Sequence, residues 1–347
     1  MNAALGLDDF FIKAKSLAVI DVRSPAEFIQ GHIPDAINLP LLNNEQRTIV
    51  GTVYNNNGSE KAVIKGYELV GPLFSNFIVE AKKIAPDKKV LIHCWRGGLR
   101  SRIMAWVLNS AGFEVHTLMG GYKTFRHWTL ETFIQPKENI IILGGMTGSG
   151  KTDYLFELKK MGEQVIDLEN LAHHKGSAFG SLGMVGAPTN EQFENELSLQ
   201  WAAINPDKIV WMEDESQNIG KIKIPDSVYK MMRLAQVVKV VIPFDIRVKR
   251  LVGDYTKFPK EDLKDGTMKI AKRLGNLRLN QSLEYLENGD MENWVKMMLE
   301  YYDKAYNHGL SQRDADTILE IEVSSKNLKD DTMQILDFIK QEKIGLG

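Results

Sequence analysis

The sequence predicts an α/β fold made of two domains in series, and three observations lead to this prediction. Short apolar segments rich in β-branched residues alternate with helical patterns along nearly the whole chain, which is typical of parallel sheets covered by helices. The length of 347 residues suits two domains of ordinary size. With 44% hydrophobic and 25% charged residues, the composition excludes collagen-like, disordered and disulfide-rich proteins.

In the first domain, buried strands are expected over residues 17–22 and 89–93, and a helix is expected over 101–109. The short polar segment 55–59 is expected to be a loop. Around residues 136–139 this pattern breaks and a new strand begins. We therefore expect the domain boundary at this break.

The second domain is expected over residues 137–347, after a first domain over 1–136. The segment from about 261 to 306 is mostly helical and charged, which predicts a helical carboxyl-terminal region. The strands of this domain are expected over 140–143, 164–167, 209–212 and 237–242.

The first candidate site is Cys94, the only cysteine of the chain, which directly follows the expected strand over 89–93. Parallel α/β sheets bind ligands at the carboxyl ends of their strands. Two glycines let the following N–H groups turn inward, the next helix adds its positive end, and Arg100 is expected to clamp an anion. Such surroundings favour a nucleophilic thiolate. The expected anion loop consists of Trp95, Arg96, Gly97, Gly98, Leu99 and Arg100.

Two chemistries use a loop of this kind. In cysteine phosphatases, which share the pattern of a cysteine, five residues and Arg-Ser, the thiolate attacks phosphorus, whereas rhodanese-type sulfurtransferases hold a persulfide. The chain resembles the rhodanese hallmark segments closely over 20–25, 27–28, 31–34, 36–38 and 120–122. Asp21, Arg23 and Glu27 are expected to form an ion-pair network that supports this domain. Because the loop is a residue longer than most rhodanese loops, it suits a larger atom or anion, and the phosphatase chemistry remains open.

The second candidate site is a complete Gly-x-x-x-x-Gly-Lys-Ser/Thr motif between the expected strand over 140–143 and a helical segment, which is the context of a phosphate-binding loop. Its glycines permit a nest of N–H groups around a diphosphate, the lysine adds positive charge, and Thr152 is a candidate Mg²⁺ ligand. The glycine-bearing segment 176–180 is either a further wall of this pocket or a plain connecting loop. The expected diphosphate site consists of Gly145, Met146, Thr147, Gly148, Ser149, Gly150, Lys151 and Thr152.

Further candidate residues follow the later strands of the second domain. Glu213, Asp214 and Glu215 end a strand in the manner of a Walker B motif, and the sequence leaves open which of them meets a metal. Between residues 245 and 280, ten Lys and Arg residues stand against five acids, which predicts either a surface for phosphate or RNA or a solvated helical face. The candidate contacts are Arg247, Arg250, Lys272, Arg273 and Arg278. The seven histidines are too scattered to predict a metal site.

These two motifs, in this order, resemble one family. A rhodanese-like parallel-sheet domain, followed by a P-loop NTPase-like α/β domain with a helical carboxyl-terminal region, is similar to the bacterial tRNA 2-selenouridine synthases over almost the whole chain. The resemblance is carried by residues 94–101, 120–123, 145–152, 176–180, 192–195, 213–216 and 273–279. At His174-Lys175 the chain departs from the His-Arg that is usual in the family.

The resemblance implies a transferase that acts on 2-thiouridine at the wobble position of certain tRNAs. Such enzymes first attach a geranyl group to the sulfur from geranyl diphosphate, and then replace the geranylthio group with selenium from selenophosphate. By analogy, Cys94 would carry the selenium as a perselenide, Arg100 would help to bind selenophosphate, and the loop over 145–152 would hold the diphosphate. The second domain also offers apolar candidates for a geranyl pocket, although each of them is expected first of all to be plain core: Phe179, Phe193, Trp201 and Trp211.

The resemblance also implies tRNA as a partner, an enzyme that supplies selenophosphate as a second partner, and no tightly bound cofactor beyond Mg²⁺ at the phosphate loop. The start of the chain lacks a signal-peptide pattern, no apolar run is long enough to span a bilayer, and a single cysteine suits a reducing compartment. A cytoplasmic protein without a membrane partner is therefore expected. Two other functions stay open: a dual-specificity-like phosphatase regulated by a nucleotide-binding domain, and a nucleotide-gated adaptor with an inactive rhodanese module.

Overall fold

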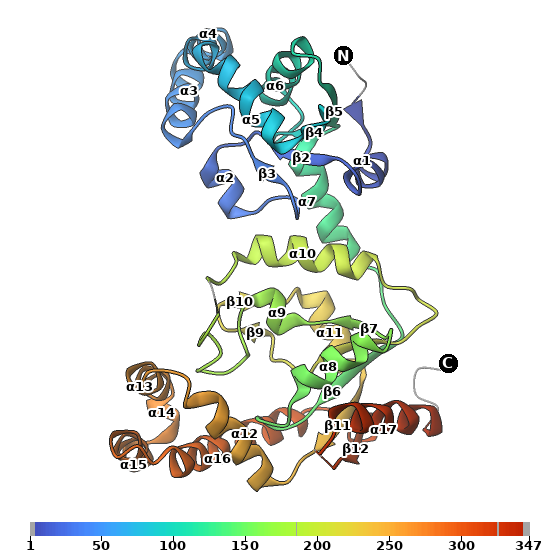
Figure 1. Ribbon diagram of the computed structural model, residues 1–347, viewed down its shortest axis with the longest axis vertical. Coiled ribbons are helices and arrows are strands. Elements are labelled where there is room, and N and C mark those ends of the chain that lie inside the picture. The colour runs from blue at the N-terminus through green and yellow to red at the C-terminus, as the bar shows by residue number, and fades with distance from the viewer. Residues whose placement is uncertain (1–3, 185, 325, 343–347) are drawn as a thin grey trace. The chain divides into compact units, whose positions relative to one another are not determined.

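The computed structural model describes residues 4–184, 186–324 and 326–342, and the chain divides into two compact units (Figure 1). The first unit comprises Met1–Thr132 together with Glu194–Ser198, and the second comprises Phe133–Phe193 and Leu199–Gly347. Each unit has its own parallel sheet and its own hydrophobic core, which confirms the α/β fold class.

The first unit is built on a parallel sheet whose described strands follow the order β1-β5-β4-β2-β3. Their bounds are β1 Ala4–Leu5, β2 Ala18–Asp21, β3 Ile37–Asn38, β4 Lys89–His93 and β5 Glu114–Leu118. In the middle strand β4, Val90, Leu91 and Ile92 are completely buried, as expected of a strand covered on both faces. The register pairs Asp21 with His93, so β2 and β4 end together at the edge of the sheet that Cys94 follows.

Helices surround this sheet. Their bounds are α1 Leu7–Ala14, α2 Pro25–Gln30, α3 Asn44–Asn57, α4 Ser59–Val70, α5 Phe74–Ile84, α6 Leu99–Ser110 and α7 Gly121–Thr132, with a 3-10 turn at Gly71–Leu73. Helices α5 and α6 pack together and bring Phe77, Met104 and Leu108 into the core with β4. Helix α2 begins with a capping box of Ser24 and Glu27, which satisfies N–H groups that a helix end leaves free.

The segment over 55–59 is helical, so the loop predicted there is wrong. Helix α3 continues through Asn57, Gly58 ends it with a φ of +85°, and α4 begins at Ser59. A single glycine in this conformation is enough to reverse the chain. The two helices then pack along each other, and this packing outweighs the weak helix propensity of asparagine in the last turn of α3.

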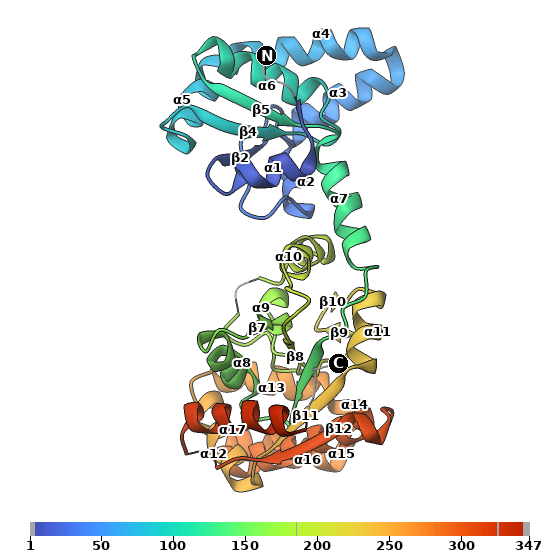
Figure 2. The same ribbon diagram turned by 90° about the vertical axis from the view of Figure 1, so that its right-hand side faces the viewer.

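The second unit contains a parallel sheet whose described strands follow the order β12-β11-β6-β8-β7 (Figure 2). Their bounds are β6 Ile140–Gly144, β7 Gln164–Ile166, β8 Val210–Glu213, β11 Gln236–Val241 and β12 Ile318–Glu322, beside an antiparallel pair of β9 Asn218–Ile219 and β10 Ile222–Lys223. The four strands expected from the sequence are confirmed to within one residue at each end. The edge strand β12 was not expected, because its alternating Ile-Leu-Glu-Ile-Glu pattern is only partly buried.

The helices of this unit form two groups. Their bounds are α8 Lys151–Lys160, α9 Leu168–Ala172, α10 Asn190–Ala202, α11 Asp226–Leu234, α12 Phe244–Tyr255, α13 Lys260–Lys269, α14 Ala271–Leu274, α15 Asn276–Glu287, α16 Met291–Leu310 and α17 Leu328–Gln341, with a 3-10 turn at Ala315–Thr317. Helices α8 and α17 pack against each other. Helices α12 to α16 share a core around Trp294, which confirms the predicted helical region (Figure 1). Among the described residues, no helix combines the length and the apolar character needed to cross a membrane.

The chain connections bring the ends of β6 and β8 together. From β6 the chain crosses through α8 to β7 at one edge, whereas from β8 it crosses through α11 to β11 on the other side of β6. Open α/β sheets bind ligands where the connections diverge in this way, outside the carboxyl ends of the strands. The fold therefore places the loop over 145–150 beside the acids of 213–215, and the N–H of Asp214 donates to the carbonyl oxygen of Leu143 over 3.2 Å.

Candidate active sites

Cys94 follows the carboxyl end of β4, and two hydrogen-bonding groups lie near its sulfur. The residue is 3% exposed. The N–H of Gly98 donates to Sγ over 3.2 Å, and the Ser101 hydroxyl lies 3.3 Å from the same atom. Gly98 also caps the start of α6, so the positive end of that helix adds to the field at the sulfur. This arrangement places an N–H donor and the start of a helix at the sulfur, which is a setting that suits a nucleophile.

The loop after Cys94 is fixed to the turn between β5 and α7. The carbonyl oxygens of Cys94 and Trp95 accept hydrogen bonds from the N–H groups of Tyr122 and Lys123, each over 2.9 Å. Gly121 has a φ of +62°, and a Cβ on it would collide with the carbonyl oxygen of Cys94. Glycine is therefore required here, because the two backbones approach too closely for any side chain.

Arg100 forms a bidentate ion pair with Glu27 of α2, with N–O distances of 2.5 and 3.0 Å. Burial alone would raise the pKa of Glu27, but the hydrogen bonds and the charge of Arg100 lower this pKa to about 2. An anion that binds in the loop must therefore compete with Glu27 for the guanidinium group. The role of Arg100 as an anion clamp stays a prediction.

The ion-pair network expected at the end of β2 is present, with a different pairing. Asp21 and Arg23 are 0% and 1% exposed, and the Arg23 guanidinium donates to both carboxylate oxygens of Asp21. It also donates to the Gly31 carbonyl over 2.6 Å and lies 3.8 Å from the ring centre of Tyr122. Glu27 pairs with Arg100 and not with these residues. The buried pair thus fixes the connection from β2 to α2, whereas Glu27 belongs to the cysteine loop.

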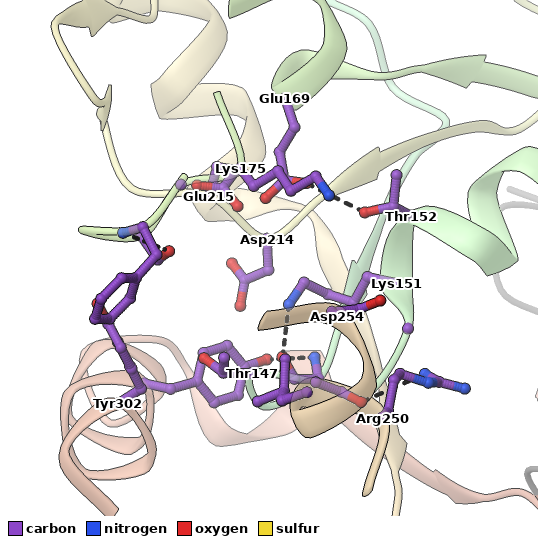
Figure 3. A pocket seen from close by; sticks show the side chains of 18 of the residues that line it. Thr147, Lys151, Thr152, Glu169, Lys175, Asp214, Glu215, Arg250, Asp254 and Tyr302 are labelled. Carbon is purple, nitrogen blue, oxygen red and sulfur yellow. Dashed lines mark hydrogen bonds between the residues drawn. The ribbon is translucent and has the colours of Figure 1, made fainter. Parts of the chain in front are cut away.

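The loop over 145–152 connects β6 to α8 and forms one wall of a pocket (Figure 3). Gly148 and Gly150 have φ values of +79° and +84°, a conformation that lets consecutive N–H groups turn toward an anion. The Lys151 ammonium group donates to the Gly145 carbonyl over 2.9 Å and so lies across the loop. The loop therefore has the conformation and the charge that a diphosphate requires.

The pocket measures about 460 Å³ and has a charged side and an aromatic side. On the charged side, Lys151, Lys175 and Arg250 surround the loop. The aromatic side consists of Phe179, Tyr255, Phe258, Tyr302 and Tyr306. Such a pocket suits a ligand with an anionic group joined to an apolar group.

The structure separates the four apolar residues considered for this pocket. Phe179 lines it, and the segment over 176–180 is one of its walls. Phe193, Trp201 and Trp211 are completely buried and are absent from the lining, so they belong to the core. For these three residues the expectation of plain core is confirmed, and only Phe179 belongs to the pocket lining.

The three acids after β8 have three different environments. Glu213 is completely buried, accepts a hydrogen bond from the N–H of Leu168 over 3.0 Å, and has a pKa well above its usual value because of its burial. Asp214 forms an ion pair with Arg313 at 2.7 Å. Asp214 and Glu215 both line the pocket, and Figure 3 shows Glu215 beside Glu169 and Lys175, with Asp214 nearer to Lys151 of the phosphate loop.

Glu215 shares the pocket with Glu169 of α9, close to Thr152. The Thr152 hydroxyl donates to Glu169 over 3.1 Å. Burial, followed by the charge of Glu169, raises the pKa of Glu215 to about 8, and burial also raises the pKa of Glu169. Glu169 was not predicted from the sequence. Its position just after β7 was the available signal, since acids after β7 and β8 reach the same edge of the sheet.

The two arginines of α12 have different roles. Arg250 lines the pocket and donates to the Gly148 carbonyl over 3.3 Å. Arg247 is 4% exposed, forms two hydrogen bonds of 2.8 Å with Asp303, and donates to the Thr147 carbonyl over 3.1 Å. Arg250 can therefore contact a ligand phosphate, whereas Arg247 supports the loop from within the protein and is not exposed to RNA.

The other predicted basic contacts lie on α14 and α15. Lys272 and Arg273 are exposed on α14. Arg278 of α15 is partly buried and lies 3.5 Å from Glu300. These three residues are placed where RNA can reach them, and their contact with RNA stays a prediction.

Comparisons with known proteins agree with this two-part architecture. A family model described as the tRNA 2-selenouridine synthase AAA domain matches residues 138–341, and one described as a rhodanese-like domain matches residues 10–127. The chain is 33% identical to a tRNA 2-selenouridine synthase of Nitrosomonas europaea, over 90% of this chain and 94% of that one. It is 34% identical to one of Bdellovibrio bacteriovorus, over 86% of this chain and 90% of that one.

Among solved structures, the N-terminal domain of a putative ATP/GTP binding protein from Clostridium difficile 630 is 33% identical, covers 37% of this chain and 99% of that chain, and has a TM-score of 0.34. The matches that decide the family are those of the curated relatives, since they extend over both units. The chain belongs to the tRNA 2-selenouridine synthase family.

Proposed function

We propose that this protein converts 2-thiouridine at the wobble position of tRNA into 2-selenouridine. The observation that supports this most is the presence, in one chain, of a thiol loop at the end of β4 and a phosphate loop with an aromatic pocket at the end of β6. A reaction in two steps, one with a diphosphate leaving group and one with a selenium carrier, uses both sites.

In the first step, geranyl diphosphate binds to the second unit. The loop over 145–152 and Arg250 hold the diphosphate, and the aromatic side of the pocket contacts the geranyl chain. Burial of this chain contributes about 0.8 kcal/mol per CH₂-sized group. The sulfur of 2-thiouridine forms a bond to the carbon that carries the diphosphate, the carbon–oxygen bond breaks, and diphosphate leaves with the electron pair while the nucleoside loses a proton. Lys151 offsets the leaving charge.

Magnesium fits the same pocket. Thr152, Glu169 and Glu215 offer the hydroxyl and carboxylate oxygens that Mg²⁺ prefers. Burial raises the pKa of both carboxyls, and a cation bound between them would favour their ionised forms. When bound, Mg²⁺ would supply positive charge next to the diphosphate. Apart from this ion, the proposed reaction needs no bound cofactor.

In the second step, selenium replaces the geranylthio group at the loop of Cys94. The S-geranylated nucleoside, selenophosphate and water give 2-selenouridine, geranylthiol and phosphate, so selenium keeps its oxidation state and no reductant is consumed. The selenium of selenophosphate forms a bond to C2 of the nucleoside, the bond between C2 and sulfur breaks, and geranylthiolate leaves with the electron pair. Water then cleaves the selenium–phosphorus bond and releases phosphate. The Cys94 loop, with the N–H of Gly98 and the hydroxyl of Ser101, holds the anion during this exchange. The partners are tRNA with 2-thiouridine at the wobble position and an enzyme that supplies selenophosphate.

The test is nucleoside mass spectrometry of tRNA that carries 2-thiouridine, incubated with the protein and both donors. With geranyl diphosphate alone, the S-geranylated nucleoside should accumulate, and the addition of selenophosphate should convert it into 2-selenouridine. If neither product forms although the tRNA binds, the proposal is wrong. Hydrolysis of an aryl phosphate at Cys94 would then favour phosphatase activity, because Cys94 and Arg100 also fit the phosphatase pattern.

A further inference from the structure

A second pocket lies within the first unit, and neither step described above uses it. It measures about 200 Å³ and is bounded by α3, α4, α6 and the segment after β3. Apart from Ser59, Arg100 and two tyrosine rings, its walls are apolar. The aliphatic side chains that line it include Leu41, Val50, Val63, Val70, Leu99 and Ile103.

This pocket shares two residues with the cysteine loop. Leu99 and Arg100 line the pocket and are also the last two residues of the loop. Leu99 directly follows Gly98, whose N–H group donates to the sulfur of Cys94. The start of α6 therefore contributes both to the surroundings of the sulfur, through Gly98, and to the wall of the pocket, through Leu99 and Arg100.

The helical hairpin of α3 and α4 leaves this pocket open to solvent. Helix α3, which is described throughout, has no buried residue, and the pocket-lining Tyr54 and Tyr67 are 59% and 45% exposed. Gly66 of α4 also lines the pocket, and a Cβ at this position would meet no atom within 4 Å. Glycine in a helix interior is unfavourable for stability. The hairpin thus keeps an apolar space accessible at some cost to its own stability.

We propose that this pocket binds the geranyl chain of the S-geranylated nucleoside while selenium replaces its sulfur at the Cys94 loop. The assignment rests on the proposed function. In that function the geranyl chain is the long apolar group that reaches the loop, and it is attached to the sulfur atom that leaves the nucleoside. An apolar cavity of about 150 Å³ holds a benzene molecule. A pocket of about 200 Å³ with an open side is therefore large enough for most of a ten-carbon chain.

Binding of the chain predicts that the second step depends on its length. Each buried CH₂-sized group contributes about 0.8 kcal/mol, so an S-methyl nucleoside should react far more slowly than an S-geranyl one. A side chain that fills the pocket should shift this preference to shorter chains, whereas damage to the cysteine loop would slow all substrates alike. The length preference therefore separates a binding role from a structural one.

The experiment compares kcat/KM for selenium transfer to RNA oligonucleotides that carry S-methyl, S-dimethylallyl or S-geranyl 2-thiouridine. Gly66→Leu fills the pocket with four carbons and should lower kcat/KM for the S-geranyl substrate on the order of 10²-fold. The kcat/KM for the S-methyl substrate should not change, so the variant should prefer the five-carbon S-dimethylallyl substrate. Val63→Phe should give the same shift. Gly51→Leu is the matched control, because Gly51 is also a helical glycine of the hairpin but does not line the pocket, and a Cβ there meets only the flexible end of Arg47.

Two results would overturn the assignment. In one, the folded Gly66→Leu and Val63→Phe proteins show the wild-type length preference; in the other, they lose all three substrates equally. Failure of the proposed function looks different, since the wild-type protein would then convert none of the alkylated RNAs. In that case direct binding of geranylthiol tests whether the pocket binds the geranyl chain. The wild type and Gly51→Leu should bind geranylthiol, and Gly66→Leu should not. Equal binding by all three proteins, or no binding by any of them, would show that the pocket does not bind this chain.

Discussion

At the scale of single residues, the Glu27–Arg100 ion pair links the stability of the cysteine loop to pH. The pKa of Glu27 is about 2 in the folded protein against an ordinary 4.5, so the pair stabilises the fold fully above about pH 4.5 and loses this effect as the pH falls toward 2. Glu27→Gln should therefore be less stable than the wild type at about pH 6, and this difference should shrink at about pH 3. Urea unfolding at both pH values measures it. If the difference in unfolding free energy between the wild type and Glu27→Gln is the same at both pH values, the ion pair is not the cause of the pH dependence. Glu60→Gln, at an exposed position, serves as the control.

Glu215 should make magnesium binding depend on pH. Burial and the charge of Glu169 raise the pKa of Glu215 to about 8, so at neutral pH the carboxyl holds a proton that an incoming cation must displace. The affinity for Mg²⁺ should then rise up to about tenfold per pH unit below pH 8 and level off above it. Calorimetric titration of the diphosphate-bound protein tests this. Glu215→Gln should weaken binding and remove most of the pH dependence, whereas the same slope in the variant would assign the proton to another group.

Single residues also show where sequence prediction succeeds and where it stops. Cys94 and Lys151 were found because their chemistry requires a fixed local pattern, in which glycines and a helix start follow a strand. Glu169 was missed because its role depends on which strands are neighbours, and strand order is a long-range property. The buried position of Arg247 was missed for the same reason, since its partner Asp303 lies 56 residues away in the sequence.

At the scale of elements, α14 and the start of α15 are the predicted contact for tRNA. The protein has a net charge of −2, so attraction to RNA must come from a local surface. Replacing Lys272, Arg273 and Arg278 by Gln should weaken tRNA binding and reduce the slope of log affinity against log salt by about one for each RNA phosphate that is no longer neutralised. Fluorescence anisotropy at several salt concentrations measures the slope. The control replaces exposed lysines on α11 and α17, namely Lys230, Lys329 and Lys340, and a slope that changes equally in both variants would show only an effect of net charge.

Elements differ in how well the sequence predicts them. Strands such as β4 and β6 were predicted well, because a short run of apolar, β-branched residues in an α/β protein is typical of a strand that is buried on both faces of the sheet. The α3–α4 hairpin was not, because α3 buries no residue and has no clear amphipathic pattern, and because the polar segment 55–59 at the junction is typical of a loop. The element that the sequence predicted least well is thus the one that carries the inferred pocket.

At the scale of the whole molecule, the two units should divide the reaction between them. The phosphate loop and its aromatic pocket belong to the second unit, and Cys94 with its anion loop belongs to the first. If each unit performs one step, a variant in one site should leave the other step intact. Lys151→Ala removes a charge that offsets the leaving diphosphate, and the loss of such an interaction commonly costs 10²–10³ in rate on an order-of-magnitude scale. Cys94→Ser removes the thiol of the loop at which selenophosphate reacts.

A two-by-two comparison tests this division. Lys151→Ala should fail to geranylate RNA with 2-thiouridine, yet it should install selenium in RNA that is already geranylated. Cys94→Ser should show the opposite pattern and accumulate the geranylated nucleoside, because a serine hydroxyl cannot replace the thiol of the loop at which selenium is transferred. Each variant is incubated with each RNA and the nucleosides are read by mass spectrometry, with thermal unfolding and tRNA binding as controls. If both variants fold, bind tRNA and still lose both steps equally, the two reactions share one composite site, because only a common site makes each step depend on both residues.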